Sequence, residues 1–354
     1  MDWLYMHMPV AGVDIFWPGL VLIGYSVGVI GGFFGMGGAW MVTPGLNILG
    51  FPMAFAIGTD IAHIAGKSMI STMRHSKFGN VDYKLGFIML IGTFVGIEVG
   101  AQIVMALERL GQIGPVVRWV YVCFLALIGA MVFYDYFKAV SGERKKSQDP
   151  SHTGATGGIN WAPALHKINI PPMMHFKVAG IYCSMWLPVT VSFITGVLAG
   201  FLGIGGGLLR MPALVYFIGV PTHIAVGTDL FEVMISGLYG AFTFSLKGRI
   251  ELVAVFVMLC GAAVGAQIGT VATKYSKGYG IRLMFGCAVV ACMISIILKQ
   301  FNFDIPATVI ILGAISAICL YIMAIMFKGA AEEIRENKRN AALAGPAPKG
   351  GGEV

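Results

Sequence analysis

Runs of about 20 apolar residues recur along this chain of 354 residues. Four of them are nearly free of charge: Leu85–Leu107, Val116–Phe137, Leu252–Thr273 and Ala307–Phe327. An α-helix needs roughly 20 residues to cross a bilayer core of about 30 Å. Strands of a membrane barrel would alternate apolar and polar residues, and these runs do not. The sequence therefore predicts an all-α polytopic membrane protein.

The composition agrees with this class and argues against nucleic-acid binding. Charged residues make up only 12% of the chain, whereas a soluble domain carries about 25%. The net charge of +7 lies mostly at the ends of the apolar runs, as membrane topology requires. The six cysteines all fall in apolar segments without a CxxC pair, so neither a zinc site nor a disulfide framework is indicated. We expect the lipid bilayer as a partner, no nucleic acid and no cofactor, and the oligomeric state stays undetermined.

A glycine-rich segment near the start of the chain recurs near its middle. The first copy reads GGFFGMGGAWMVTP at Gly31–Pro44, and the second reads AGFLGIGGGLLRMP at Ala199–Pro212. Glycine and proline at this density break a helix. A helix broken at the same place in both halves of an apolar chain indicates the substrate site of a transporter. The chain is therefore expected to contain two structural repeats.

Glycine also recurs at four-residue spacing inside one later apolar run of each half. These positions are Gly92, Gly96 and Gly100 in the first half, and Gly261, Gly265 and Gly269 in the second. Small residues at this spacing allow two membrane helices to approach closely. We interpret these glycines as helix-packing positions.

Each glycine-rich segment leads into an apolar segment that is too short to cross a bilayer comfortably. These segments are residues 39–50 and 208–219. They are either the return arms of re-entrant hairpins or short spans. Irregular backbone at that depth is tolerated only where it is buried in protein or lines a cavity.

The distribution of Lys and Arg favours return arms. If the arms return, 5 basic residues lie outside and 17 lie on the cytoplasmic side, which is the asymmetry seen in membrane proteins. If they do not return, the basic residues divide almost evenly. The return-arm model describes a multi-pass protein of the cytoplasmic (inner) membrane, with its N-terminus outside and its C-terminus in the cytoplasm. It also makes the two repeats inverted.

The pattern predicts five regions. Each repeat is a broken or re-entrant helical hairpin followed by three transmembrane helices, and one extra C-terminal helix follows the second repeat. The regions are a first transmembrane repeat at 1–138, a cytoplasmic linker at 139–176, a second transmembrane repeat at 177–300, a C-terminal transmembrane helix at 301–329 and a polar cytoplasmic tail at 330–354.

The two glycine-rich motifs resemble those of the sulfite exporter TauE/SafE family, the TSUP permeases. A later pair in each half, Gly58-Thr59 and Gly227-Thr228, fits the same family. The resemblance implies a transporter, not an enzyme, for small sulfur-containing or organic anions such as sulfite, sulfonates and sulfoacetate. The family often has Ser after the Gly-Thr pair, whereas this chain has Asp60 and Asp229. This departure concerns residues that would contact the substrate.

Candidate substrate-binding residues lie in the glycine-rich turns and in the polar positions that follow them. They are Gly35, Gly37, Gly38, Thr59, Lys67, Gly203, Gly205, Gly206, Arg210 and Thr228. An arginine offers a fixed fork of donors that suits a sulfonate or carboxylate, and helix N-termini add oriented N–H groups. For Arg210 the alternatives are a buried carboxylate partner or a side chain that reaches the interface.

Four further ionisable residues are candidates for proton or ion coupling: Asp60, His63, Asp229 and Glu232. An ionisable group in the bilayer costs at least about 2.5–3.5 kcal/mol on insertion scales, so each needs a reason to be there. Asp60, His63 and Lys67 share one helix face through their spacing. For Asp60 and Asp229 the alternative is helix N-capping. The leading hypothesis is a secondary transporter that works by alternating access, and the sequence leaves its coupling to protons open.

A membrane-embedded metal-dependent enzyme is the alternative function. Asp60 and His63 are three residues apart, as are Asp229 and Glu232. Carboxylate and histidine pairs at that spacing hold metals in helix bundles. Sequence motifs of metalloproteases, serine hydrolases and P-loop proteins do not occur in the chain, so no catalytic or metal-binding residue is predicted.

Overall fold

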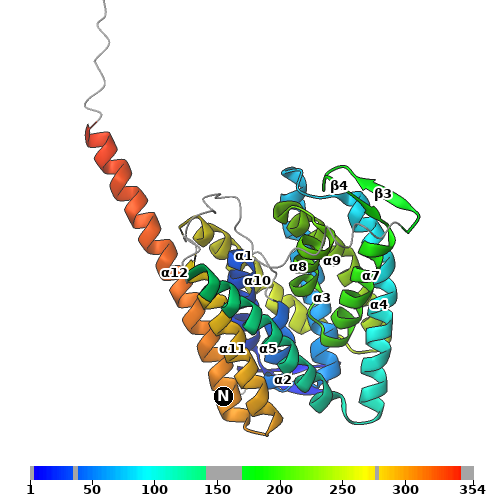
Figure 1. The fold of residues 1–354 in the computed structure, drawn as a ribbon. Helices are drawn as coiled ribbons and strands as arrows, with labels where there is room; N and C mark the ends of the chain where they lie inside the picture. Colours follow the sequence, from blue (N-terminus) through cyan, green and yellow to red (C-terminus); the bar gives the residue numbers. More distant parts are fainter. Residues whose placement is uncertain (1–3, 35–38, 141–169, 276–278, 344–354) are drawn as a thin grey trace, which may run out of the picture.

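A computed structural model describes residues 4–34, 39–140, 170–275 and 279–343 (Figure 1). The described chain is almost entirely helical, which confirms the all-α membrane class. The first half contains α1 (Trp17–Phe34), a 3₁₀ turn (Ala39–Met41), α2 (Val42–Leu49), α3 (Met53–Lys77), α4 (Tyr83–Arg109) and α5 (Ile113–Val140). The second half contains α7 (Trp186–Leu202), α8 (Gly207–Ala213), a π-helical turn (Leu214–Ile218), α9 (Thr222–Leu246), α10 (Leu252–Tyr275), α11 (Tyr279–Gln300) and α12 (Asp304–Leu343).

Five stretches of the described helices are long and apolar enough to cross a membrane. They are Tyr83–Arg109, Ile113–Tyr134, His223–Leu246, Leu252–Gly269 and Asp304–Glu333. Helix α3 is not among them, although it has 25 residues. Its mean hydropathy is lowered by polar residues that are buried inside the protein, among them Asp60 and Lys67. A long helix with a buried polar face is suited to line a site or a path rather than to face lipid.

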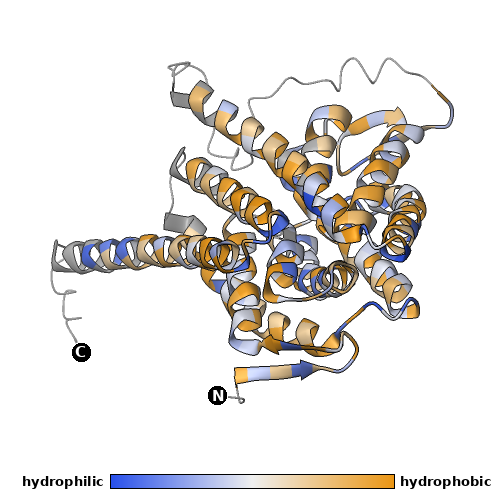
Figure 2. Cartoon of the chain, turned by 90° about the horizontal axis from the view of Figure 1, so that it is seen from below, coloured by the Kyte–Doolittle hydropathy of each residue, from blue (hydrophilic) through white to orange (hydrophobic). Residues whose placement is uncertain are grey.

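The helices form two groups that meet along α3 and α10. Helices α4, α7 and α9 pack with α3, while α5, α11 and α12 lie on the side of α1 and α10 (Figure 1). Helix α12 leans outward at the edge, and its C-terminal part becomes hydrophilic (Figure 2). It continues as one helix through residue 329, the predicted limit of the C-terminal span.

The closest helix pairs each join one helix of the first half to one of the second. Helix α1 packs on α10, and α4 packs on α7. A Cβ atom added to Gly96 would lie 2.5 Å from the carbonyl oxygen of Phe193, and one added to Gly261 would lie 2.6 Å from that of Val21. The structure confirms that these glycines are helix-packing positions. Because each pair takes one helix from each half, the halves are interlocked rather than separate.

Two short β-hairpins precede the first helices of the two halves, and the hydropathy pattern predicts neither. One consists of β1 (Tyr5–Met8) and β2 (Val13–Phe16), the other of β3 (Met173–Phe176) and β4 (Ile181–Ser184). Both are antiparallel, and the end pairs Tyr5–Phe16 and Met173–Ser184 are 168 positions apart. The internal repeat therefore begins earlier than the glycine-rich segment.

Each hairpin is held by the opposite half of the molecule. The amide of Ala11 donates to Glu251 Oε2 at 3.1 Å, and the amide of Ala179 donates to Asp82 Oδ2 at 3.0 Å. Glu251 and Asp82 follow α9 and α3, which are corresponding helices. The β3–β4 hairpin and the N-terminus lie at opposite ends of the helix bundle (Figure 1). The inverted orientation of the repeats across a membrane stays a prediction.

Candidate functional site

A cluster of ionisable side chains is buried where α3, α8 and α9 meet. None of its members is more than 8% exposed: Asp60, His63, Lys67, Arg210, Asp229 and Glu232. All six are among the site residues predicted from the sequence, and the structure places them in two groups: Asp60, His63 and Lys67 on α3, and Arg210, Asp229 and Glu232 on α8 and α9. The predicted residues Gly35, Gly37 and Gly38 lie outside the described residues.

The second glycine-rich turn runs between α7 and α8. Its backbone has positive φ at Gly203, Gly205 and Gly206, with φ of 80°, 66° and 76°. Residues with a side chain rarely adopt this conformation, so glycine is required here. Because the helix stops at Leu202 and restarts at Gly207, the chain turns sharply in the interior and presents Arg210 to the cluster.

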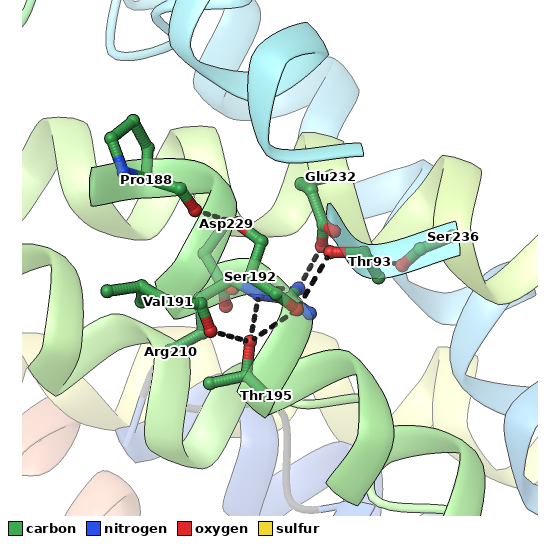
Figure 3. Close-up of polar contacts among 9 residues, drawn as sticks. All are labelled: Thr93, Pro188, Val191, Ser192, Thr195, Arg210, Asp229, Glu232 and Ser236. Carbon is green, nitrogen blue, oxygen red and sulfur yellow. Dashed lines mark hydrogen bonds and ion pairs between the residues drawn. The ribbon is translucent and has the colours of Figure 1, made fainter. Parts of the chain in front are cut away.

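Arg210 is fully buried and is held by two helices (Figure 3). Its Nε donates to Thr195 Oγ1 on α7 at 3.1 Å. Its Nη1 forms an ion pair with Glu232 and lies 3.5 Å from Asp229 Oδ1, both on α9. Of the alternatives for Arg210, pairing with a buried carboxylate is the arrangement found, and it involves two carboxylates.

Two polar atoms of this ion-pair group have no hydrogen-bond partner in the described part of the chain. They are Nη2 of Arg210 and Oε1 of Glu232. The second oxygen of Glu232 also accepts from Ser236 Oγ at 3.4 Å. Buried polar groups are usually satisfied. An unsatisfied donor beside an unsatisfied acceptor indicates a position where a ligand, a proton or water takes part.

Asp60 caps a helix other than its own. It lies within α3, which begins at Met53, so capping of its own helix is contradicted. Its Oδ2 instead accepts from the amide and the hydroxyl of Thr43, at 3.0 and 2.7 Å. Thr43 is in the first turn of α2, where unpaired amides attract negative charge. Asp229 likewise lies inside α9, well past its start at Thr222, so it does not cap that helix.

His63 and Lys67 follow Asp60 along the same face of α3. Nδ1 of His63 lies 4.0 Å from Asp60 Oδ1, beyond hydrogen-bond distance. Neither ring nitrogen of His63 has a hydrogen-bond partner in the described ranges, nor does Nζ of Lys67. The face therefore offers an anion a buried ammonium group that is not already hydrogen-bonded to the protein.

The glycine-rich turn separates the α3 face from the Arg210 group. A Cβ atom added to Gly205 would lie 3.0 Å from Ile64 on α3 and 3.6 Å from Val233 on α9. One added to Gly203 would lie 2.6 Å from the hydroxyl of Thr43. A small cavity beside the turn is lined by Ile61, Ile64, Ile97, Ala199, Gly205, Ser236 and Gly237. The turn therefore lies between α3 and α9, and the cavity beside it is lined mostly by apolar residues together with Ser236, which contacts Glu232.

Thr59 and Thr228, both predicted to contact substrate, hold the opposite half of the molecule in this structure. The hydroxyl of Thr59 accepts from the amide of Glu251 at 3.1 Å, and that of Thr228 accepts from the amide of Asp82 at 3.0 Å. The two contacts correspond in the repeats. Their shared role here is to fix the turns that also receive the β-hairpins.

Sequence reasoning missed the hydroxyl residues that orient the charged groups. Thr43 holds Asp60, Thr195 holds Arg210, and Ser236 contacts Glu232. A hydroxyl in an apolar helix is a common residue, so its position alone gave no signal. Among the described residues, no group of three or more His, Cys, Asp or Glu side chains is placed to hold a metal ion.

The family model and the curated relatives that match this chain all describe membrane transport proteins. The family model for the sulfite exporter TauE/SafE matches residues 20–296. "Probable membrane transporter protein YunE" of Bacillus subtilis is 25% identical over 258 residues, which cover 71% of this chain and 86% of the relative. A "Probable membrane transporter protein" of Xylella fastidiosa is 24% identical over 284 residues, which cover 79% and 92%. No solved structure matches. Because the family model spans most of the chain, the protein belongs to the TauE/SafE sulfite exporter family.

Proposed function

We propose that this membrane transporter carries a small anion of the sulfite, sulfonate or sulfoacetate type across the cytoplasmic membrane. The observation that carries the proposal is Lys67, whose ammonium group is buried and has no hydrogen-bond partner in the described chain. Asp60 attracts Lys67 along the same face of α3, but a buried ammonium group that makes no hydrogen bond is still costly. An anion that pairs with Lys67 removes that cost, so the charge is best explained as part of a binding site.

The anion would bind between the α3 face and the glycine-rich turn. Lys67 and His63 would approach it from α3, and the unpartnered Nη2 of Arg210 would approach from α8. Arg210 adds planar donors that match the oxygens of a sulfonate. Gly205 and Gly206 keep the backbone of the turn free of side chains, so the anion can approach it closely. The first turn, with Gly35, Gly37 and Gly38, would complete the site from the other repeat.

Transport would proceed by alternating access between two inverted repeats. The opposite placement of the β3–β4 hairpin and the N-terminus supports inversion (Figure 1), as do the corresponding contacts of Glu251 and Asp82. In such carriers the repeats exchange conformations around a fixed central site. The charge asymmetry of the loops further supports an outer N-terminus and a cytoplasmic C-terminus. Buried carboxylates near the site would allow protons to take part.

An anion-binding screen with matched lysine variants tests the proposal. Purified protein is heated with sulfite, methanesulfonate or acetate, and with choline as a cation control. A ligand that binds only the folded state stabilises it, by about 2.7 kcal/mol at 100 times its Kd. We expect an anion to raise the Tm of the wild type but not of Lys67→Met, which keeps the length of the side chain and removes its charge.

Lys247→Met is the matched control because Lys247 pairs with Glu98, away from the cluster. It should respond to the anion as the wild type does. If Lys67→Met responds as strongly as Lys247→Met, Lys67 is not an anion ligand and the assigned site is wrong. A wild type that responds to choline and to no anion would contradict the substrate class.

A further inference from the structure

The buried cluster holds one more carboxylate than it holds permanent cations. On α8 and α9 the described chain places two carboxylates, Asp229 and Glu232, beside the single cation Arg210. On α3 it places one carboxylate, Asp60, against one cation, Lys67. None of the five is more than 8% exposed. With all of them ionised and His63 neutral, the cluster carries a net charge of −1. Binding of a monovalent anion would change the net charge of the cluster from −1 to −2. Such an excess of negative charge is strongly unfavourable in surroundings of low dielectric constant. An anion therefore needs a proton to accompany it into the cluster.

Of the three carboxylates, Glu232 competes most directly with an anion. It forms the closer of the two ion pairs with Nη1 of Arg210, since Asp229 stands 3.5 Å away. Its Oε1 has no hydrogen-bond partner in the described chain, so it is free to take a proton. Asp60 is engaged by two bonds from Thr43 and does not contact Arg210. Protonation of Glu232 would remove the closer ion pair of Nη1 and leave Asp229 as the carboxylate beside it, 3.5 Å away. Nη1 and the unpartnered Nη2 could then both donate to an anion.

We propose that Glu232 is a proton-operated competitor of the anion for Arg210. When Glu232 takes a proton from the solvent, its ion pair breaks, and the guanidinium binds one monovalent anion. When the proton leaves, Glu232 recovers Arg210 and the anion is expelled, so one proton and one anion cross together. Arg210 keeps its position throughout, because Nε stays bonded to Thr195. This inference rests on the proposed anion carrier and adds the residue that couples it to protons.

In the described chain Arg210 has one other carboxylate partner, Asp229, whose Oδ1 lies 3.5 Å from Nη1. The ionisable groups around Glu232 in the described chain are Arg210 on α8 and Asp229 on α9 itself, and helix α3, which packs against α9, carries Asp60, His63 and Lys67. The described parts of α4 and α7 contribute neutral groups, Thr93, Ser192 and Thr195 (Figure 3). In the sequence repeat the residue that corresponds to Glu232 is His63. The pairing of a glutamate with an arginine is therefore found in the second repeat and not at the corresponding positions of the first.

Proton uptake on anion binding tests the assignment. Detergent-solubilised protein is titrated with methanesulfonate or acetate in weakly buffered solution between pH 6 and 8, where each probe keeps its single charge. We expect the wild type to take up about one proton per bound anion, and its affinity to rise about tenfold for each unit of pH lowered, as linkage requires. Glu232→Gln should bind the anion at all these pH values without proton uptake.

Glu98→Gln is the matched control because Glu98 lies outside the cluster and pairs with Lys247. It should keep the proton uptake of the wild type. Glu232→Asp, which keeps a carboxyl group on a shorter side chain, should still take up a proton when the anion binds, so it tests the role of the carboxyl group even if Glu232→Gln does not fold. Anion binding to the wild type without proton uptake would overturn this inference and leave the anion carrier intact. Failure of both the wild type and Glu232→Gln to bind either probe would instead overturn the carrier proposal.

Discussion

At the scale of single residues, Gly203 shows how the broken helix is specified. Its φ of 80° is unfavourable for any residue with a side chain, by roughly 1–2 kcal/mol. The space for a Cβ atom is also missing, because that atom would lie 2.6 Å from the hydroxyl of Thr43. We expect Gly203→Ala to lower the free energy of unfolding by about 2–4 kcal/mol in total, since overpacking adds to the backbone cost.

Gly12 is a suitable control for this substitution. It has a φ of 66° in the β1–β2 turn, and an added Cβ atom would meet nothing within 4 Å. Gly12→Ala should therefore show the backbone cost alone. The measurement is the Tm of both variants in the same detergent. Equal losses would show that the turn is not crowded against Thr43, and the described site geometry would then be incorrect.

The ionisable residues of the site could be predicted from the sequence because each interrupts an apolar run. The hydrogen-bond and ion-pair partners of these residues could not be predicted from the sequence. Capping of its own helix is one sequence-based alternative for Asp60, whereas it caps α2, which precedes it across a turn. Arg210 could be identified as unusual, but its hydrogen bond to Thr195 depends on how α7 packs against α8. Such contacts arise from tertiary packing, which a single helix pattern does not contain.

At the scale of helices, the pair α4–α7 depends on glycine. A Cβ atom at Gly96 would lie 2.5 Å from the carbonyl oxygen of Phe193 and 2.7 Å from the amide of Val197. Gly96→Ala must therefore push the two helices apart or distort them, and we expect a loss of about 1–3 kcal/mol in stability. The unfolding of the purified variant in detergent, followed by tryptophan fluorescence, measures the loss.

Gly313→Ala is the control for the helix-pair prediction. Gly313 lies in α12, and an added Cβ atom would meet nothing within 4 Å. Alanine favours a helix over glycine by up to about 1 kcal/mol, so this variant should be as stable as the wild type or slightly more so. If Gly96→Ala is no less stable than Gly313→Ala, the close α4–α7 packing is wrong.

The glycine spacing of these helices was sufficient to predict close packing, because glycine at four-residue intervals leaves one helix face without side chains for a partner helix to approach. The β-hairpins were not predictable in the same way. Their strands have four residues each, and β1 and β2 mix apolar with polar residues. Both hairpins are contacted from the opposite half, through Glu251 and Asp82, and a hydropathy pattern contains no information about such contacts.

At the scale of the whole molecule, the contacts between the halves are nearly symmetric and the charged site is not. Helices pair across the halves, and Thr59 and Thr228 hold corresponding turns. The ion pairs of Arg210 have no counterpart in the first repeat, where Val42 corresponds to Arg210. In the proposed mechanism a symmetric scaffold would allow the two equivalent conformations that alternating access requires, and the asymmetric charges would select the anion.

Solute counterflow in reconstituted vesicles distinguishes an alternating carrier from a channel and tests the role of Lys67 in transport. Vesicles are loaded with unlabelled sulfite and diluted into a small amount of labelled sulfite. A carrier that alternates around the cluster of Lys67 and Arg210 will accumulate label transiently above its equilibrium level, and Lys67→Met vesicles will not. Label that only equilibrates would indicate a channel. Uptake by the wild type no greater than by protein-free vesicles would contradict the account.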